Sequence, residues 1–302
     1  MLETTPRKIL VGVTGDEDVQ AALGFAAAEA RRRGAGVHLV HVLHPVLISP
    51  DGVPLTVEER AVRKFGRKAL DHAALALEHE LGEELPVSTE LAHGPVTRVL
   101  ADIAQHAGLV VLQHQRMGQR GLVPTLSTTN PVAALSPVPV VAVPAGWSES
   151  SDRQTVTAAV HEPGGSHEIV RAALEEAHLR GATLRLLHAW HYSDVYDDLI
   201  FDAEGVARHD AEQVQAMTAD LAPLLAEYPD VETEVVARHA RAGQALVDET
   251  QQVALLVVGR HRHAIPLGPH LGSVVRAVLR LGTCPVMVVD PVPPSTTTIE
   301  EA

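Results

Sequence analysis

Hydrophobic and polar positions follow two alternating patterns along the chain. Short, largely apolar runs such as residues 7–13, 37–43 and 255–258 are typical of strands in a parallel sheet that is covered on both faces. Between such runs lie longer segments, such as residues 20–33 and 168–180, in which apolar side chains recur at helical spacing. Strands that alternate with helices in this way predict an α/β fold with a parallel sheet and right-handed crossovers.

The same order of strands and helices occurs twice. After a polar linker, the second half of the chain repeats the spacing of the first, and we interpret this as an internal duplication. The corresponding positions are Gly34 and Gly181, His41 and His188, Gly94 and Gly243, Gln113 and Gly259, and Pro139 and Pro285. We therefore expect one domain in residues 1–145, a second in residues 154–290, and a disordered tail in residues 291–302.

Composition limits the partners of this 302-residue protein. Hydrophobic residues make up 46% of the chain, which is ample for two cores. The formal net charge of −14 argues against nucleic acid or an anionic membrane as a partner. Residues 1–150 carry 13 basic and 16 acidic side chains, whereas residues 151–302 carry 11 and 22. We interpret the acidic excess of the second half as a solvated helical surface.

The cysteine content and the length of the apolar runs indicate a soluble, cytoplasmic protein. Cys284 is the only cysteine, so no disulfide can form within the chain, and its place before an apolar strand predicts a buried thiol. The first residues lack the long apolar stretch of a signal peptide. No apolar run reaches the length that spans a membrane.

A strand, a loop and a helix near the C-terminus form the most informative segment. An apolar strand ends at Gly259, and thirteen residues later Gly272 and Ser273 stand directly before a helical segment that begins at Val274. Ser273 is suited to cap this helix, and Gly272 lets a ligand approach the backbone closely. Because the free N–H groups and the dipole of a helix N-terminus attract negative charge, the segment predicts an anion site.

The spacing of this segment resembles the ATP-binding loop of the universal stress protein family. Residues 259–273 fit the frame G-x2-G-x9-G-[ST], and the Cys-Pro-Val strand of that family follows at residues 284–286. The resemblance implies two tandem Rossmann-like domains, similar to the adenine nucleotide alpha hydrolases. Each has a five-stranded parallel sheet of order 3-2-1-4-5 with helices on both faces. It also implies that the glycines line the ribose and phosphates of ATP, and that the two halves pack as a pseudo-dimer within the chain.

Three positions depart from the family pattern. The second glycine of the frame is Arg262, which either fills the phosphate pocket or binds a phosphate with its guanidinium group. Nucleotide-binding members carry an acidic residue at the end of the first strand, where this chain has Thr14 in the first half and His161 in the second. Neither side chain supplies a fixed carboxylate, although His161 is able to donate to a nucleoside or stack on it.

The two halves keep different amounts of the ATP-binding frame. In the first half Gln113, Arg116 and Leu126 replace the glycines, so their side chains occupy the space in which backbone N–H groups would meet phosphate. We therefore expect a degenerate, structural first half and a single nucleotide per chain, in the second half. The residues expected to bind it are His161, Gly259, Arg262, Gly272, Ser273 and Val274.

Two functional hypotheses follow from the sequence. The first is a stress-response regulator of the universal stress protein type that binds ATP or a related nucleotide in its second half. The second is a nucleotide-free scaffold that binds an unidentified protein partner. We expect no catalysis, because the chain has no P-loop and no nucleophile elbow. We also expect no metal site, because no cysteine pair or carboxylate with closed ligand spacing accompanies the histidines. A third hypothesis, hydrolysis of an adenine nucleotide, lacks an evident acid, base or nucleophile beside the loop.

Overall fold

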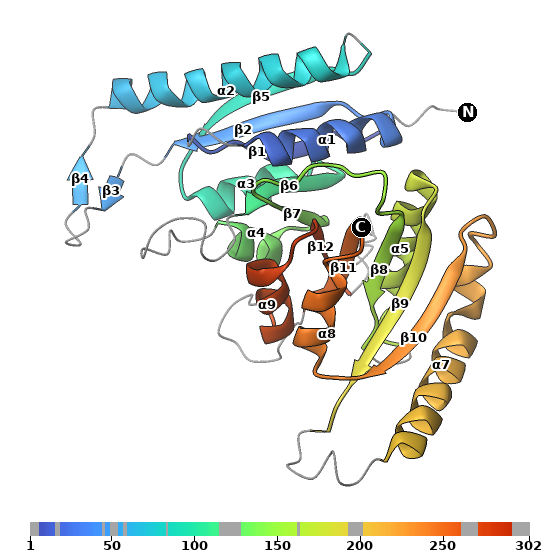
Figure 1. Cartoon of the computed structure of the whole chain (residues 1–302). Coiled ribbons are helices and arrows are strands. Elements are labelled where there is room, and N and C mark those ends of the chain that lie inside the picture. Colours follow the sequence, from blue (N-terminus) through green and yellow to red (C-terminus); the bar gives the residue numbers. More distant parts are fainter. Residues whose placement is uncertain are drawn as a thin grey trace, which may run out of the picture.

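One large sheet with helices on both faces forms the centre of the molecule (Figure 1). The computed structural model describes residues 6–15, 19–43, 46–48, 54–56, 59–82, 84–114, 128–161, 164–192, 202–260 and 271–291. Two short strands, β3 (Val46–Ile48) and β4 (Pro54–Thr56), form a separate antiparallel hairpin beside it. The sequence, with its prolines and an Asp-Gly pair, predicts only a loop over this stretch, so that prediction is wrong where the hairpin forms.

The first half contributes five strands to the large sheet. In chain order these are β1 (Ile9–Gly12), β2 (Val37–Leu43), β5 (Val87–His93), β6 (Leu109–His114) and β7 (Val140–Pro144). They lie side by side in the order β5-β2-β1-β6-β7, and all neighbours are parallel. The helices of this half are α1 (Gln20–Arg33), α2 (Glu59–Leu81), α3 (Val96–Ala104) and α4 (Thr129–Leu135).

The second half repeats this arrangement. Its strands are β8 (Thr155–Ala159), β9 (Thr183–Trp190), β10 (Thr233–His239), β11 (Leu255–Gly259) and β12 (Val286–Val289). Its described helices are α5 (His167–Arg180), α7 (Ala203–Leu225), α8 (Ala242–Glu249) and α9 (Ser273–Leu281). The order β10-β9-β8-β11-β12 is again 3-2-1-4-5 with parallel neighbours, which confirms the predicted fold class.

The last strands of the two halves pair with each other and join the two sheets into one of ten strands. β7 and β12 are antiparallel, and Val141 lies opposite Met287 at the middle of the pair. Both strands are buried throughout. The pairing therefore removes two apolar strand edges that would otherwise be open to other chains.

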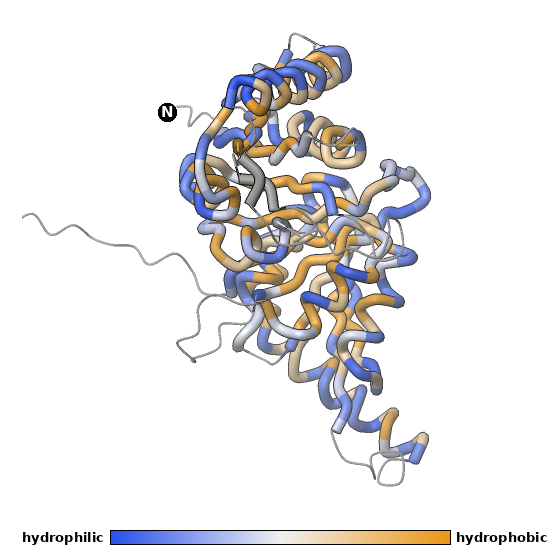
Figure 2. Tube along the Cα trace, turned by 90° about the vertical axis from the view of Figure 1, so that its left-hand side faces the viewer, coloured by the Kyte–Doolittle hydropathy of each residue, from blue (hydrophilic) through white to orange (hydrophobic). Residues whose placement is uncertain are grey.

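Each face of the sheet carries its own core. Alternate side chains of β1 point to opposite faces, so Ile9 and Val11 belong to one cluster and Leu10 to the other. α1, α2, α5 and α7 cover the first face, and α3, α4, α8 and α9 cover the second. Figure 2 shows the hydrophobic strands running through the middle of the molecule between helices with hydrophilic outer surfaces.

The first helix of each half ends in the same way. α1 and α5 both have 14 residues and end at Gly34 and Gly181, whose φ angles are 59° and 58°. These angles lie in the left-handed region, where glycine has no steric penalty. The bounds that the sequence predicts for α1 are therefore correct at both ends.

One of the predicted correspondences between the halves is wrong. α3 follows Pro95 and α8 follows Arg241, so Gly94 corresponds to Ala240 and not to Gly243. Gly94 has a φ of 132° and therefore needs to be glycine at this bend. Gly243 instead lies in the first turn of α8, where no such angle is required.

Candidate functional site

The candidate site lies where the strand order of the second half changes direction. From β8 the chain moves outward to β9 and β10, whereas β11 and β12 lie on the other side of β8. In parallel α/β sheets such a switch point opens a crevice at the carboxyl ends of the two central strands. Gly259 ends β11 and His161 lies two residues beyond β8, so the structure brings both to this edge.

The N-terminus of α9 lies in the segment that follows β11. Gly272 is the residue before the helix, with φ −58° and ψ 160°, and Ser273 is the first helical residue. The predicted cap at Ser273 is therefore displaced by one position, and the N-cap residue, a glycine, has no side chain with which to cap the helix. Arg276 makes the first backbone bond, to the carbonyl of Gly272 at 3.1 Å. The N–H groups of the first turn, including that of Val274, remain directed at the space before the helix.

Arg262 falls in residues 261–270, outside the described part of the chain. Its two predicted roles, filling a phosphate pocket or binding a phosphate, therefore both stay predictions.

Hydrogen bonds on both sides hold the carboxyl end of β8. The backbone N–H of His161 donates to Ser166 Oγ at 3.2 Å, directly before α5. On the other side, His188 Nδ1 on β9 donates to the carbonyl O of Val160 at 3.0 Å. The same bond occurs in the first half, where His41 Nδ1 donates to Val13 at 2.8 Å. The sequence shows that His41 and His188 correspond, but it does not reveal their shared role of fixing the end of the first strand.

Gly259 has a packing reason to be glycine. A Cβ atom at this position would lie only 2.5 Å from Cδ1 of Ile169, which projects from the first turn of α5. Ile169 is buried, with 6% of its surface exposed, so its side chain is held in place. The spacing of glycines in the sequence does not show this contact, because Ile169 lies far from Gly259 in the chain.

In the first half the helix supplies the small residue of this contact and the strand supplies the large one. Ala22 takes the place of Ile169, and Gln113 takes the place of Gly259. The side chain of Gln113 fills the space and accepts a hydrogen bond from the N–H of Ala22 at 3.3 Å. At the end of β1, a Cβ at Gly15 would overlap the ring of Phe65. Side chains thus occupy the carboxyl edge of the first half at the ends of β1 and β6.

Each half also contacts the fourth helix of the other half. Arg260, the residue after Gly259, donates to the carbonyls of Ala134 and Ser136 at the end of α4, at 2.8 and 2.9 Å, and also binds Asp290. His114 stands in the corresponding place and lies close to the backbone of Leu279 in α9. Burial lowers the pKa of His114, and the Leu279 backbone only partly offsets this. Neither ring nitrogen of His114 has a hydrogen-bond partner of normal geometry among the described residues.

Four buried charges meet between α1 and α5. Glu29 and Arg33 come from the first half, and Glu176 and Arg180 are their counterparts in the second. Each arginine binds the glutamate of both halves, so the group has approximate twofold symmetry. Burial raises the pKa of Glu176, and Arg180 beside it opposes this rise. The sequence analysis missed this group entirely.

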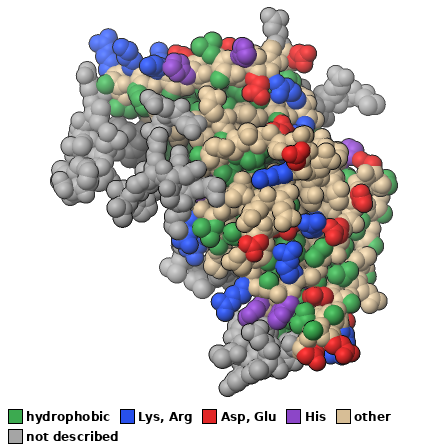
Figure 3. Space-filling view, viewed as in Figure 1, with side chains coloured by type: hydrophobic (Ala, Val, Ile, Leu, Met, Phe, Trp, Pro, Cys, Tyr) green, Lys and Arg blue, Asp and Glu red, His purple; other side chains and the backbone are tan. Residues whose placement is uncertain are grey.

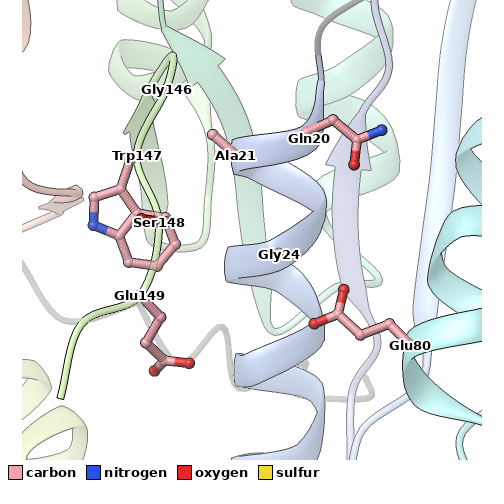
Figure 4. Close-up of a pocket in the computed structure, with 8 residues that line it drawn as sticks. All are labelled: Gln20, Ala21, Gly24, Glu80, Gly146, Trp147, Ser148 and Glu149. Carbon is pink, nitrogen blue, oxygen red and sulfur yellow. The ribbon is translucent and has the colours of Figure 1, made fainter.

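A groove of about 350 Å³ crosses α1 between the end of α2 and the linker (Figure 4). Trp147 and Glu149 line one side and Glu80 the other, and Gly24 leaves the floor open because no atom approaches its Cβ position within 4 Å. The residues that line the groove include none of those expected to bind nucleotide.

The described residues contain neither a metal-binding cluster nor a membrane-spanning helix. No three His, Cys, Asp or Glu side chains there are placed to hold a metal ion. None of the described helices is both long enough and apolar enough to cross a membrane.

Comparison with known proteins identifies the family of this chain. The family model described as the universal stress protein family matches residues 5–144 and again residues 153–290. A universal stress protein of Mycolicibacterium smegmatis is 33% identical over 289 residues, which cover 94% of this chain and 97% of the relative. One of Mycobacterium tuberculosis is 28% identical over 303 residues, which cover 93% of this chain and 94% of that protein. The chain therefore belongs to the universal stress protein family, as a tandem member.

A solved structure shows the same fold. The crystal structure of a universal stress protein from Archaeoglobus fulgidus superposes with a TM-score of 0.66 at 15% identity, and the match covers 95% of this chain and 97% of that one. This agreement concerns the arrangement of helices and strands, because the sequences have diverged widely.

Proposed function

We propose that the protein is a stress-response regulator that binds ATP or a related adenine nucleotide in its second half. The observation that carries this proposal is the N-terminus of α9, where Gly272 stands directly before Ser273 and has no side chain of its own to cap the N–H groups of the helix. Such a terminus, reached from the carboxyl end of β11, suits the phosphates of a nucleotide. His161, at the end of the neighbouring β8, is then placed to contact the nucleoside.

In this proposal the first half is the structural partner in an intrachain pseudo-dimer. The β7–β12 pair and the buried charges between α1 and α5 support a fixed association of the halves. Gln113 and Phe65 occupy the corresponding edge of the first half, which supports a single site per chain. In this proposal backbone N–H groups at the start of α9 hold the phosphates, and they supply no nucleophile or base, so we propose binding without catalysis.

A nucleotide-free scaffold is the second candidate, and one contact favours it. Because Ile169 packs against Gly259, that glycine is needed for packing whether or not a nucleotide binds. In this case the second-half edge is filled from α5, much as Gln113 fills the first-half edge. The protein would then act through a protein partner.

Titration calorimetry with ATP, at fixed magnesium and salt, separates the two candidates. We expect one site per chain, and loss of binding in Gly272→Leu, because a side chain there keeps phosphate from the helix N–H groups. Ser127 is the residue of the first half that corresponds to Ser273. Ser127→Ala is therefore a control and should leave the affinity for ATP unchanged. Two equal sites, or full affinity in Gly272→Leu, would contradict the proposal. If the wild type binds none of ATP, ADP and AMP, the nucleotide-free scaffold is the candidate function that remains.

A further inference from the structure

The start of α2 carries an unusual concentration of positive charge. Five of the 24 lysines and arginines of the chain fall within nine residues of this helix. Four of the five are exposed and make no ion pair with any described residue, whereas the fifth, Arg63, pairs with Glu59 at 2.6 Å. Figure 3 shows this group of basic side chains at one end of the molecule, at the upper left. The four exposed cations are Arg60, Lys64, Arg67 and Lys68.

These cations do not stabilise the helix that carries them. Arg60 lies in its first turn, where the helix dipole disfavours positive charge. Arg60 and Lys64 are four residues apart, as are Lys64 and Lys68, and like charges at this spacing repel each other. The only acidic residue in the first turn, Glu59, is already paired with Arg63. A group of charges that disfavours its own helix points to a ligand outside the molecule.

The duplicated helix of the second half lacks this feature. α2 and α7 both have 23 residues and both lie on the same face of the sheet. α7 carries one arginine, Arg208, and no lysine, together with four acidic residues. The shared fold therefore does not require a basic helix at this place, and the charge belongs to the first half alone.

The same surface also exposes large apolar side chains. Phe65, in the middle of the basic group, is 55% exposed, and Leu75 farther along α2 is 64% exposed. The opposite side of the helix packs into the core through Leu70 and Leu77, so α2 is a fixed ridge on the outside of the fold. A ridge of cations with partly exposed apolar side chains beside it fits a broad anionic layer.

We propose that the N-terminal part of α2 is a docking surface for the anionic phospholipids of a membrane. The contact is peripheral: the four exposed cations meet phosphate head groups, and the exposed part of the Phe65 ring, whose other part packs against Gly15, faces the head groups. The net charge of −14 led us to expect no anionic membrane as a partner, and the proposal departs from that expectation for α2 alone. The same charge opposes approach of the rest of the molecule and so orients it with α2 toward the membrane. The proposal is independent of nucleotide binding, because α2 includes none of the residues assigned to that site.

Co-sedimentation of the full chain with vesicles tests the proposal. We expect binding to vesicles that contain equal parts of phosphatidylcholine and phosphatidylglycerol, and none to pure phosphatidylcholine. High salt should release the protein, because the attraction between exposed charges is screened. The test variant replaces Arg60, Lys64, Arg67 and Lys68 with glutamine. It should lose at least tenfold in affinity and melt no lower than the wild type, since the repulsion within the helix is relieved.

A matched control removes the same number of charges elsewhere. Arg98, Arg208, Arg241 and Arg280 are exposed and dispersed over both halves, so their joint change to glutamine should leave vesicle binding unchanged. Phe65→Ser leaves the charge of α2 unchanged and should weaken binding to vesicles at moderate salt. The melting temperature of this variant reports any loss of the packing between Phe65 and Gly15.

Three outcomes would overturn the proposal. They are equal binding to both kinds of vesicle, equal loss of binding in the dispersed control, and binding of a short DNA duplex without binding to anionic vesicles. The last outcome would assign the basic surface to nucleic acid instead of lipid.

Discussion

Arg180 of α5 donates to Glu29 of α1 at 2.5 Å, across the boundary between the two halves of the chain. Arg33 and Glu176 make the reciprocal contact, so the same pair of residue types binds in both directions. The side chain of Glu29 is fully buried and that of Arg180 is 7% exposed. Removing one charge from such a group leaves an excess of the opposite charge buried among the remaining members, which still contact each other.

Glu29→Gln should therefore lower the free energy of unfolding by about 3–5 kcal/mol. Denaturant unfolding of Glu29→Gln, Arg180→Met and the double variant measures this cost. The double variant should lose much less than the sum of the single changes, because it removes both charges together. Arg171→Gln, which breaks the exposed pair with Glu227, is the control and should have little effect. Additive losses would show that Glu29 and Arg180 do not act as a unit.

Gly259→Ala should destabilise the protein by about 1–3 kcal/mol, because the new methyl group meets Cδ1 of Ile169. Ile169→Val removes that atom, so the double variant should unfold at a higher denaturant concentration than Gly259→Ala alone. Gly24→Ala is the control: nothing lies near its Cβ position, and alanine at this helical site should stabilise by about 0.5–1 kcal/mol. If Ile169→Val fails to relieve Gly259→Ala, the packing explanation for this glycine is wrong.

His114→Leu should stabilise the protein by about 1–3 kcal/mol at neutral pH, because the buried ring nitrogens of His114 have no hydrogen-bond partner among the described residues. It should also weaken the dependence of stability on pH. The pKa of His114 is lowered in the folded protein, so below about 6.5 the unfolded chain binds the proton first and the wild type loses stability.

Melting temperatures of wild type and His114→Leu, measured from neutral pH downward, check this prediction. The gap between the two proteins should widen as the pH falls. The exposed His106 provides the control, since His106→Asn should melt in parallel with the wild type. A constant gap would mean that protonation of His114 is not coupled to unfolding.

Cys284 should not react with thiol reagents in the folded protein. The side chain is buried, and burial raises the pKa of the thiol to about 12, so the reactive thiolate is scarce at neutral pH. A colorimetric thiol assay should detect no free thiol in native protein and one per chain in denaturant. Rapid labelling of the native protein would show that the segment before β12 opens more often than its burial implies.

The sequence predicts local features of this fold well. The bounds of α1 and the glycines that end α1 and α5 follow from signals within a few residues, namely helical spacing and a position that requires positive φ. The burial of Cys284 follows in the same way from the apolar strand beside it. The strand order is different, because it comes from the family resemblance and not from the pattern itself.

Contacts between distant segments account for what the sequence did not reveal. Ile169 and Gly259 meet although they are far apart in the chain, and neither residue type is unusual in its own segment. The internal duplication contains a usable signal, since Ala22 and Gln113 exchange small and large side chains with this pair. Glu29 and Glu176 are likewise corresponding positions. The sequence does not show that they lie on the helix faces that meet, so the charges of both helices look as if they were exposed to solvent.

The antiparallel pairing of β7 with β12 makes association of the halves a property of a single molecule. For two separate chains that met through the same edges, the fraction associated would fall on dilution. Here the linker holds the edges at an effective concentration of roughly millimolar, whatever the amount of protein. Each molecule also contains one copy of each half, so no exchange can pair two first halves or two second halves within one sheet. A substitution in one half therefore always faces the same unaltered other half of its own chain. The carboxyl edges of the two halves can thus diverge in sequence, and every molecule still has the same pair of halves.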